Sequence, residues 1–171
     1  MKKYELTAEF IEKWGKKLFR IKALISFGSV EVGELGGYVE KEDNLAQDGN
    51  AWVYGNARVC GDAEVYGDAR VCGNAEVYGD AKVCGDADYL LIGRIGSRFS
   101  FTTFFKNKDK GITVSCGCFL GTIAEFRAKV SDTHGNNKHA KIYNLAADMA
   151  ELQILGEEYF DKLNTNKSEP F

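Results

Sequence analysis

A six-residue repeat runs from Val53 to Asp88 and constrains the fold more than any other feature of this sequence. The segment reads VYGNAR VCGDAE VYGDAR VCGNAE VYGDAK VCGDAD. An α-helix turns once in about 3.6 residues, so this period would scatter the valines around its whole surface. Short strands separated by tight turns fit the period, because Gly-Asn and Gly-Asp tolerate the backbone angles of such turns. Valine and alanine are expected to point inward.

Three hexapeptides would complete one coil of a three-sided parallel β-helix, which places residues 18 positions apart in neighbouring strands. This spacing predicts that outward side chains of opposite charge lie side by side. The expected pairs are Arg58 with Glu76, Glu64 with Lys82, and Arg70 with Asp88. It also predicts that each repeat cysteine stacks on a tyrosine, so the three repeat cysteines lie on different faces. A disulfide or shared metal site among them is then excluded within one chain.

The segments that flank the repeat predict other elements. Residues 1–34 are strand-like and are expected to form a small β cap near the first coil. Residues 35–52 resemble an irregular coil, with Val39, Leu45 and Ala51 in the register of the repeat alanines.

The segment after the repeat predicts mixed structure. YLLIGRIG is expected to be a last partial coil, and FSFTTFF and GITVSCGCF are expected to form a β-hairpin around KNKDK. Thr122 and Glu125 have the spacing of a capping box, so a helix should begin there and end near Gly135. A second helix is expected after Asn137, followed beyond Gly156 by a frayed polar tail. The expected buried stripe of this second helix is Ala140, Tyr143, Ala147 and Ala150, with Leu152 and Ile154 nearby.

Composition limits the class of protein. The formal net charge is −3 and no basic run is present, so duplex nucleic acid is not an expected partner. No apolar stretch approaches the roughly 20 residues that span a bilayer, and the first residues lack an apolar signal core. The five cysteines suit a reducing compartment. We therefore expect a cytoplasmic protein that does not associate with membranes.

The repeat motif resembles the hexapeptide-repeat superfamily of bacterial transferases, and resembles even more the hexapeptide-repeat proteins of phages and mobile elements. The lead-in LGGYVEKEDNLAQDGNAWVYGNA and the later IGSRFSFTTFF and VSCGCFLGT share this resemblance. It implies a left-handed β-helix and a homotrimer. The expected fold is mainly β, with a left-handed parallel β-helix at 35–95, an N-terminal β cap at 1–34, and an α+β module at 96–171 built of a hairpin and two helices.

A possible metal site combines Cys116, Cys118, His134 and His139. The histidine spacing falls in the range of zinc fingers, whereas the cysteine spacing, C-x-C, is shorter than usual. Two thiols on one strand face could still bind zinc, although the simpler interpretation is a buried thiol pair beside a helix end. We expect no cofactor, with zinc as the alternative. Cys118 with His134 as its base is an alternative catalytic pair.

Candidate ligand-binding residues lie in two parts of the chain. Gly121 and Thr122 open a helix whose free N–H groups could attract phosphate, and Arg98, Thr102 and Thr103 supply further donors. Three repeat tyrosines offer stacking surfaces for a planar ring. These tyrosines are Tyr54, Tyr66 and Tyr78.

No catalytic constellation emerges from these residues, and the repeats contain no histidine of the kind that hexapeptide acyltransferases use as a base. The leading hypothesis is a non-enzymatic homotrimeric scaffold from a phage or mobile element. It would act in the host cytoplasm by binding a nucleotide signal or a host protein and so antagonise host defence. The alternatives are an acyltransferase-like enzyme and a virion or assembly component.

Overall fold

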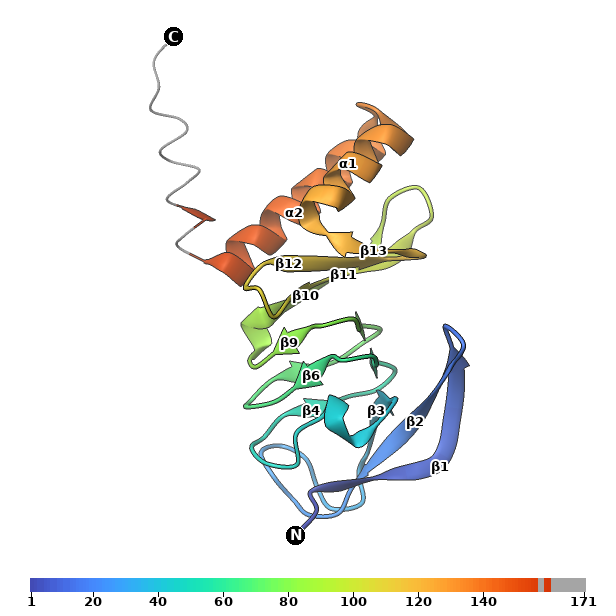
Figure 1. Ribbon diagram of the computed structural model, residues 1–171, viewed down its shortest axis with the longest axis vertical. Coiled ribbons are helices and arrows are strands. Elements are labelled where there is room, and N and C mark those ends of the chain that lie inside the picture. The colour runs from blue at the N-terminus through green and yellow to red at the C-terminus, as the bar shows by residue number, and fades with distance from the viewer. Residues whose placement is uncertain (157–158, 161–171) are drawn as a thin grey trace.

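The computed structural model describes residues 1–156 and 159–160 of the chain. Three parts follow one another along its long axis (Figure 1): an N-terminal hairpin, the hexapeptide repeats, and a sheet covered by two helices. None of the described helices is long and apolar enough to cross a membrane.

The N-terminal part is a long antiparallel hairpin, as the strand-like sequence predicts. Strand β1 (Tyr4–Lys13) pairs with β2 (Lys16–Ala23), and β2 pairs with β3 (Leu35–Val39). The hairpin reaches well beyond the first coil, because its tip runs alongside the repeats (Figure 1). There the ring of Trp14 lies 4.8 Å from that of Tyr78 in the fifth repeat.

Each hexapeptide forms one two-residue strand, and strands 18 residues apart pair in parallel. The pairs are β5 with β8, β4 with β7, and β6 with β9. Their valines and the first five repeat alanines are buried, at 0–1% exposure, whereas Ala87 of the last repeat is exposed. Two of the expected charge pairs form, Arg58 with Glu76 and Glu64 with Lys82, while Asp88 pairs with Lys106. These six strands are β4 (Trp52–Val53), β5 (Arg58–Val59), β6 (Glu64–Val65), β7 (Arg70–Val71), β8 (Glu76–Val77) and β9 (Lys82–Val83).

The predicted fold class, a mainly β chain built on a left-handed parallel β-helix, is wrong. The chain is mixed, with 24% of its residues in helices and 40% in strands that form several small separate sheets. The repeat strands are too short to make continuous faces, because a turn follows every two paired residues. One sheet, in the order β1-β2-β3-β5-β8, joins the antiparallel hairpin to parallel repeat strands and is therefore itself mixed.

The lead-in differs from the predicted register. Val39 pairs with Val59, and Leu45 forms a bridge with Val65. Both residues are therefore in register with the repeat valines and not with the repeat alanines. The shift arises because the connection from Leu45 to Val53, which contains the short sequence AQDGN, is longer than one hexapeptide. A short 3-10 turn, η1 (Glu42–Asn44), precedes it, and a second, η2 (Asp86–Asp88), ends the repeats.

The C-terminal part contains a four-stranded antiparallel sheet. Its strands, in spatial order, are β10 (Tyr89–Ile95), β11 (Ser100–Lys106), β12 (Ile112–Cys116) and β13 (Phe119–Thr122). The predicted β11–β12 hairpin is confirmed. The prediction of a partial coil at YLLIGRIG is wrong, because this segment is β10 and pairs antiparallel with β11. It lacks the Gly-Asn or Gly-Asp turn that would end a strand after two residues.

Two helices, α1 (Ile123–His134) and α2 (Lys138–Leu155), cover one face of this sheet (Figure 1). The capping box of Thr122 and Glu125 and the end at Gly135 are confirmed, and the side chain of Asn137 caps α2. The predicted α2 stripe is buried apart from Leu152, which is 41% exposed. The predicted frayed tail lies largely outside the described residues.

The sheet separates two hydrophobic cores. Phe105 belongs to the core of the repeats, whereas the adjacent Phe104 packs in the core beneath the helices. Alternation along β11 therefore directs neighbouring rings to opposite faces. In this way the sheet covers the open end of the repeats and supports the helices at the same time.

Candidate ligand-binding site

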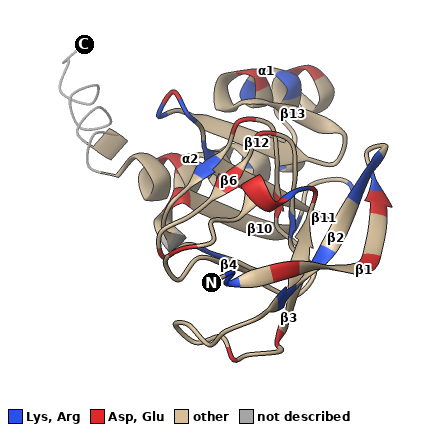
Figure 2. Ribbon diagram, turned by 60° about the horizontal axis from the view of Figure 1, so that its bottom comes forward, with Lys and Arg blue, Asp and Glu red and all other residues tan. Residues whose placement is uncertain are grey.

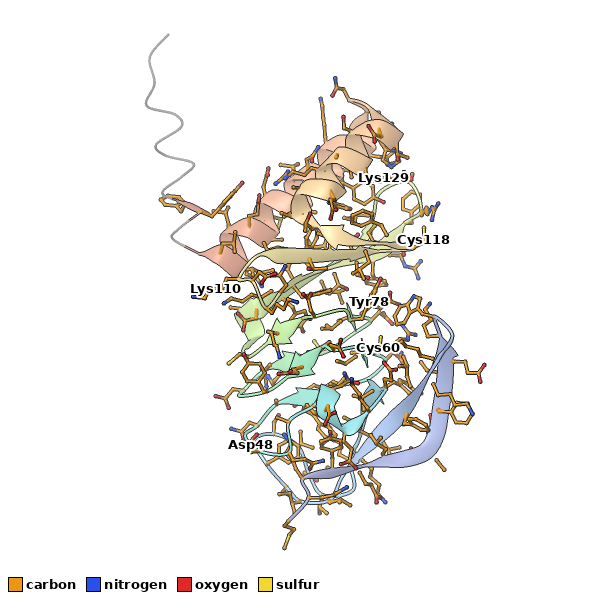
Figure 3. All side chains as sticks on the ribbon, in the orientation of Figure 1. Asp48, Cys60, Tyr78, Lys110, Cys118 and Lys129 are labelled. Atoms are coloured by element: carbon orange, nitrogen blue, oxygen red, sulfur yellow. The ribbon has the colours of Figure 1, made fainter. Side chains whose placement is uncertain are left out.

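A cavity of about 420 Å³ opens between the C-terminal sheet and its helices. The β10–β11 loop supplies Arg98, the end of β12 supplies Cys116, and the β12–β13 turn supplies Cys118. Helix α1 supplies Phe126 and Lys129, and α2 supplies Tyr143. Cys118 and Lys129 lie on the same side of this part of the molecule (Figure 3).

Aromatic rings form the inner wall of the cavity. Phe126 is 3% exposed and makes edge-to-face contacts with Phe104 and Tyr143. Phe119 adds a ring whose centre lies 5.7 Å from that of Phe126. These side chains face each other because β11, β13, α1 and α2 enclose one core. The apolar ring surfaces of this wall suit a planar ligand group.

Tyr143 also brings a polar group to this wall. Burial raises the pKa of its phenol, and the neighbouring Cys116 raises it further, so the hydroxyl stays protonated at neutral pH. The ring of His134 stacks on it with a centroid distance of 5.7 Å. Tyr143 thus places a protonated hydroxyl beside Cys116 at this wall.

Two cations and no carboxylate line the described part of the cavity. The cations, Arg98 and Lys129, are both exposed. Within the described residues neither has an ion-pair partner, so their charges are available to an anion. Arginine can hold a phosphate with two parallel hydrogen bonds, and lysine acts as a point charge.

Of the predicted ligand-binding residues, Arg98 lines the cavity, but the two threonines do not. Thr102 is 1% exposed and donates a hydrogen bond from its hydroxyl to Sγ of Cys116 at 3.2 Å. The Thr103 hydroxyl accepts a hydrogen bond from the backbone N–H of Glu76. Both hydroxyls thus contribute to packing between elements.

Gly121 and Thr122 lie at the helix start, as predicted, but outside the cavity lining. The carboxylate of Glu125 accepts hydrogen bonds from the Thr122 backbone N–H at 2.8 Å and from its hydroxyl at 2.9 Å. These bonds lower the pKa of Glu125. A negative charge of the protein itself therefore already occupies the position where a phosphate was expected.

The three repeat tyrosines do not form one stacking surface. Tyr54 lines a separate cavity of about 490 Å³ that also contains Cys72, its expected stacking partner. Tyr66 is 39% exposed. Tyr78 is covered by Trp14 and packs beside Cys60 (Figure 3). The 18-residue spacing places them on different faces of the repeats.

Three of the four predicted zinc ligands share the cavity. Cys116, Cys118 and His134 line it, and the ring of His139 lies 5.8 Å from that of His134. The buried Nδ1 of His139 has no hydrogen-bond partner among the described residues. In the same part of the chain, no group of three or more His, Cys, Asp and Glu side chains is arranged to hold a metal ion.

Sequence reasoning missed the aromatic wall and Lys129. Phe126 and Lys129 are three residues apart in α1 and so share a face of the helix, which is a signal present in the sequence. Tyr143 was assigned only to the core of α2. Nothing in the sequence indicated that the β10–β11 loop and the β12–β13 turn would meet beside this face.

The chain matches no protein-family model and no curated protein.

Proposed function

We propose that this chain is a non-enzymatic binding protein that holds a nucleotide in the cavity between its C-terminal sheet and helices. One observation carries the proposal: Arg98 and Lys129, two cations without ion-pair partners among the residues that the structure describes, stand at a cavity whose inner wall is aromatic. A nucleotide combines the two matching chemical groups, an anionic phosphate and a planar base.

The size of the cavity agrees with this ligand class. Small-molecule sites commonly have volumes of about 300–1,000 Å³ and a mostly apolar lining with a few polar groups. At about 420 Å³ the cavity is large enough for a nucleoside monophosphate. The base would lie against Phe119 and Phe126, and the phosphate would lie near Arg98 and Lys129.

The biological part of the proposal follows from the resemblance to proteins of phages and mobile elements. In such a setting a nucleotide-binding protein would remove a signal on which host defence depends. The same resemblance is the basis for proposing a homotrimer in the host cytoplasm. The binding chemistry proposed for the cavity does not depend on either point.

Isothermal titration calorimetry with AMP, GMP, CMP and UMP tests the proposal. We expect at least one of them to bind, and Arg98→Gln and Lys129→Gln to weaken binding by about tenfold each, because each loses a charge-assisted contact. Lys110→Gln is the matched control, since Lys110 lies on the opposite side of the same module (Figure 3). The absence of binding by all four nucleotides would contradict the proposal, as would equal losses in the control.

A further inference from the structure

A second, cationic cleft adjoins the proposed nucleotide cavity. It has a volume of about 610 Å³ and lies between the tip of the β1–β2 hairpin, the repeats and the β10–β11 hairpin. Its basic residues come from three parts of the chain, and basic residues also gather at the hairpin tip (Figure 2). These basic residues are Lys13, Arg58, Arg94 and Arg98.

The charges of the cleft are unbalanced. Glu76, the one acidic residue among the described residues that line it, is 3.2 Å from Arg58 and 3.9 Å from Lys13. The other two basic residues, Arg94 and Arg98, have no ion pair or hydrogen-bond partner within the described residues. The cleft therefore keeps a positive surplus on the side nearest the cavity, where an anion can approach.

The cavity and the cleft are continuous. Arg98, Ser100, Gly117 and Cys118 line both of them. Gly117, at φ +62°, allows the tight β12–β13 turn beside this junction, and a side chain there would come within 3.7 Å of the Arg98 guanidinium. A ligand that fills the cavity can thus extend past Arg98 into the cleft.

We infer that the ligand is a nucleotide with more than one phosphate group, whose phosphate chain runs from the cavity past Arg98 to Arg94. This inference rests on the proposed function and adds the number of phosphates to it. The base occupies the aromatic cavity, the first phosphate lies near Lys129 and Arg98, and the following phosphates lie in the cleft. The Ser100 hydroxyl at the junction provides an uncharged donor to the same chain.

The test compares the affinities of nucleoside mono-, di- and triphosphates that carry the base bound best by the wild-type protein. We expect affinity to rise by about tenfold from the monophosphate to the triphosphate, as expected for at least one added charge-assisted contact. The ratio of the two affinities should fall toward one in Arg94→Gln and stay as in wild type in Lys110→Gln. The rise should also shrink at high salt, because the cleft is exposed.

The outcomes separate the inference from the proposed function. If monophosphate and triphosphate bind equally well, the inference is overturned while the nucleotide-binding function stands. If the triphosphate binds more tightly but Arg94→Gln keeps the full ratio, the assignment of the phosphate chain to the cleft is overturned. If no nucleotide binds at all, the proposed function fails, and the inference fails with it.

Discussion

The phenol of Tyr143 occupies the space that a side chain at Gly96 would fill. Gly96 has a φ of +72°, in the left-handed region that favours glycine. It precedes Ser97 and Arg98 in the β10–β11 loop, so its close contact with the ring of Tyr143 fixes this loop against α2. The position of one cation of the proposed nucleotide site therefore depends on a glycine that does not itself line the cavity.

Replacing Gly96 by alanine should lower both stability and nucleotide affinity. The new methyl group would overlap the Tyr143 ring and strain the backbone, which together cost about 2–4 kcal/mol. Urea unfolding measures the loss of stability, and calorimetry measures affinity. The control is Gly85→Ala, because a side chain at Gly85 would meet no atom within 4 Å. An unchanged unfolding midpoint for Gly96→Ala would show that the loop moves freely.

Thr122→Ala should lower stability and leave nucleotide affinity unchanged. The Thr122 hydroxyl accepts a hydrogen bond from the backbone N–H of Glu125, and losing such a cap costs about 1 kcal/mol. Thr122 lies outside the lining of the cavity and of the cleft. Thermal unfolding and calorimetry on the same preparation measure the two effects. A loss of affinity similar to that of Lys129→Gln would contradict this prediction and show that the helix start takes part in ligand binding.

The thiol of Cys60 should react slowly even at alkaline pH. Burial raises the pKa of Cys60 to about 11, and its side chain is packed beneath Leu18 and Tyr38. At pH 9 we expect iodoacetamide to modify Cys60 at least about tenfold more slowly than the exposed Cys72, as followed by peptide mass spectrometry. Equal rates in the native protein would show that the hairpin opens readily.

The raised pKa of the Cys60 thiol also predicts that the stability of the protein depends on pH. The pKa of Cys60 is higher in the folded state than its ordinary value of 9.0, so the folded state favours the protonated thiol. This contribution is fully present below about pH 9 and is lost as the pH rises to about 11. The difference in unfolding free energy between wild type and Cys60→Ala should therefore shrink across this interval. A constant difference would contradict the assignment.

The local patterns of the sequence predicted individual elements well. The two helices begin and end where the capping box, Asn137 and the following glycines place them, because these signals depend only on nearby residues. The 18-residue spacing of the repeat strands follows from periodicity in the same way. The predicted fold class nevertheless failed, because the repeat dominates the sequence pattern while the other segments contribute long antiparallel strands and helices.

The site was harder to predict because its residues meet only through tertiary packing. Arg98 and Lys129 are separated by three strands and half of a helix, and no periodicity connects them. Thr102 had the right residue type, but β11 directs its hydroxyl into a packing contact with Cys116. Thr103 does line the cationic cleft, although its hydroxyl accepts a hydrogen bond from the backbone of Glu76. The start of α1 at Thr122 has the free N–H groups that attract an anion. However, the carboxylate of Glu125, the second residue of the capping box, already binds there.

The hexapeptide repeats set the width of the cationic cleft. Lys13 and Trp14 reach the cleft from a hairpin that runs alongside the repeats, and Trp14 is fixed there on Tyr78. Arg94 and Arg98 form the opposite wall of the cleft and belong to the segment that follows the last repeat. Three more hexapeptides inserted after Tyr78 would add one strand spacing of about 4.8 Å between these two walls. A change in repeat number could thus alter the length of anion that fits, without replacing any residue that touches it.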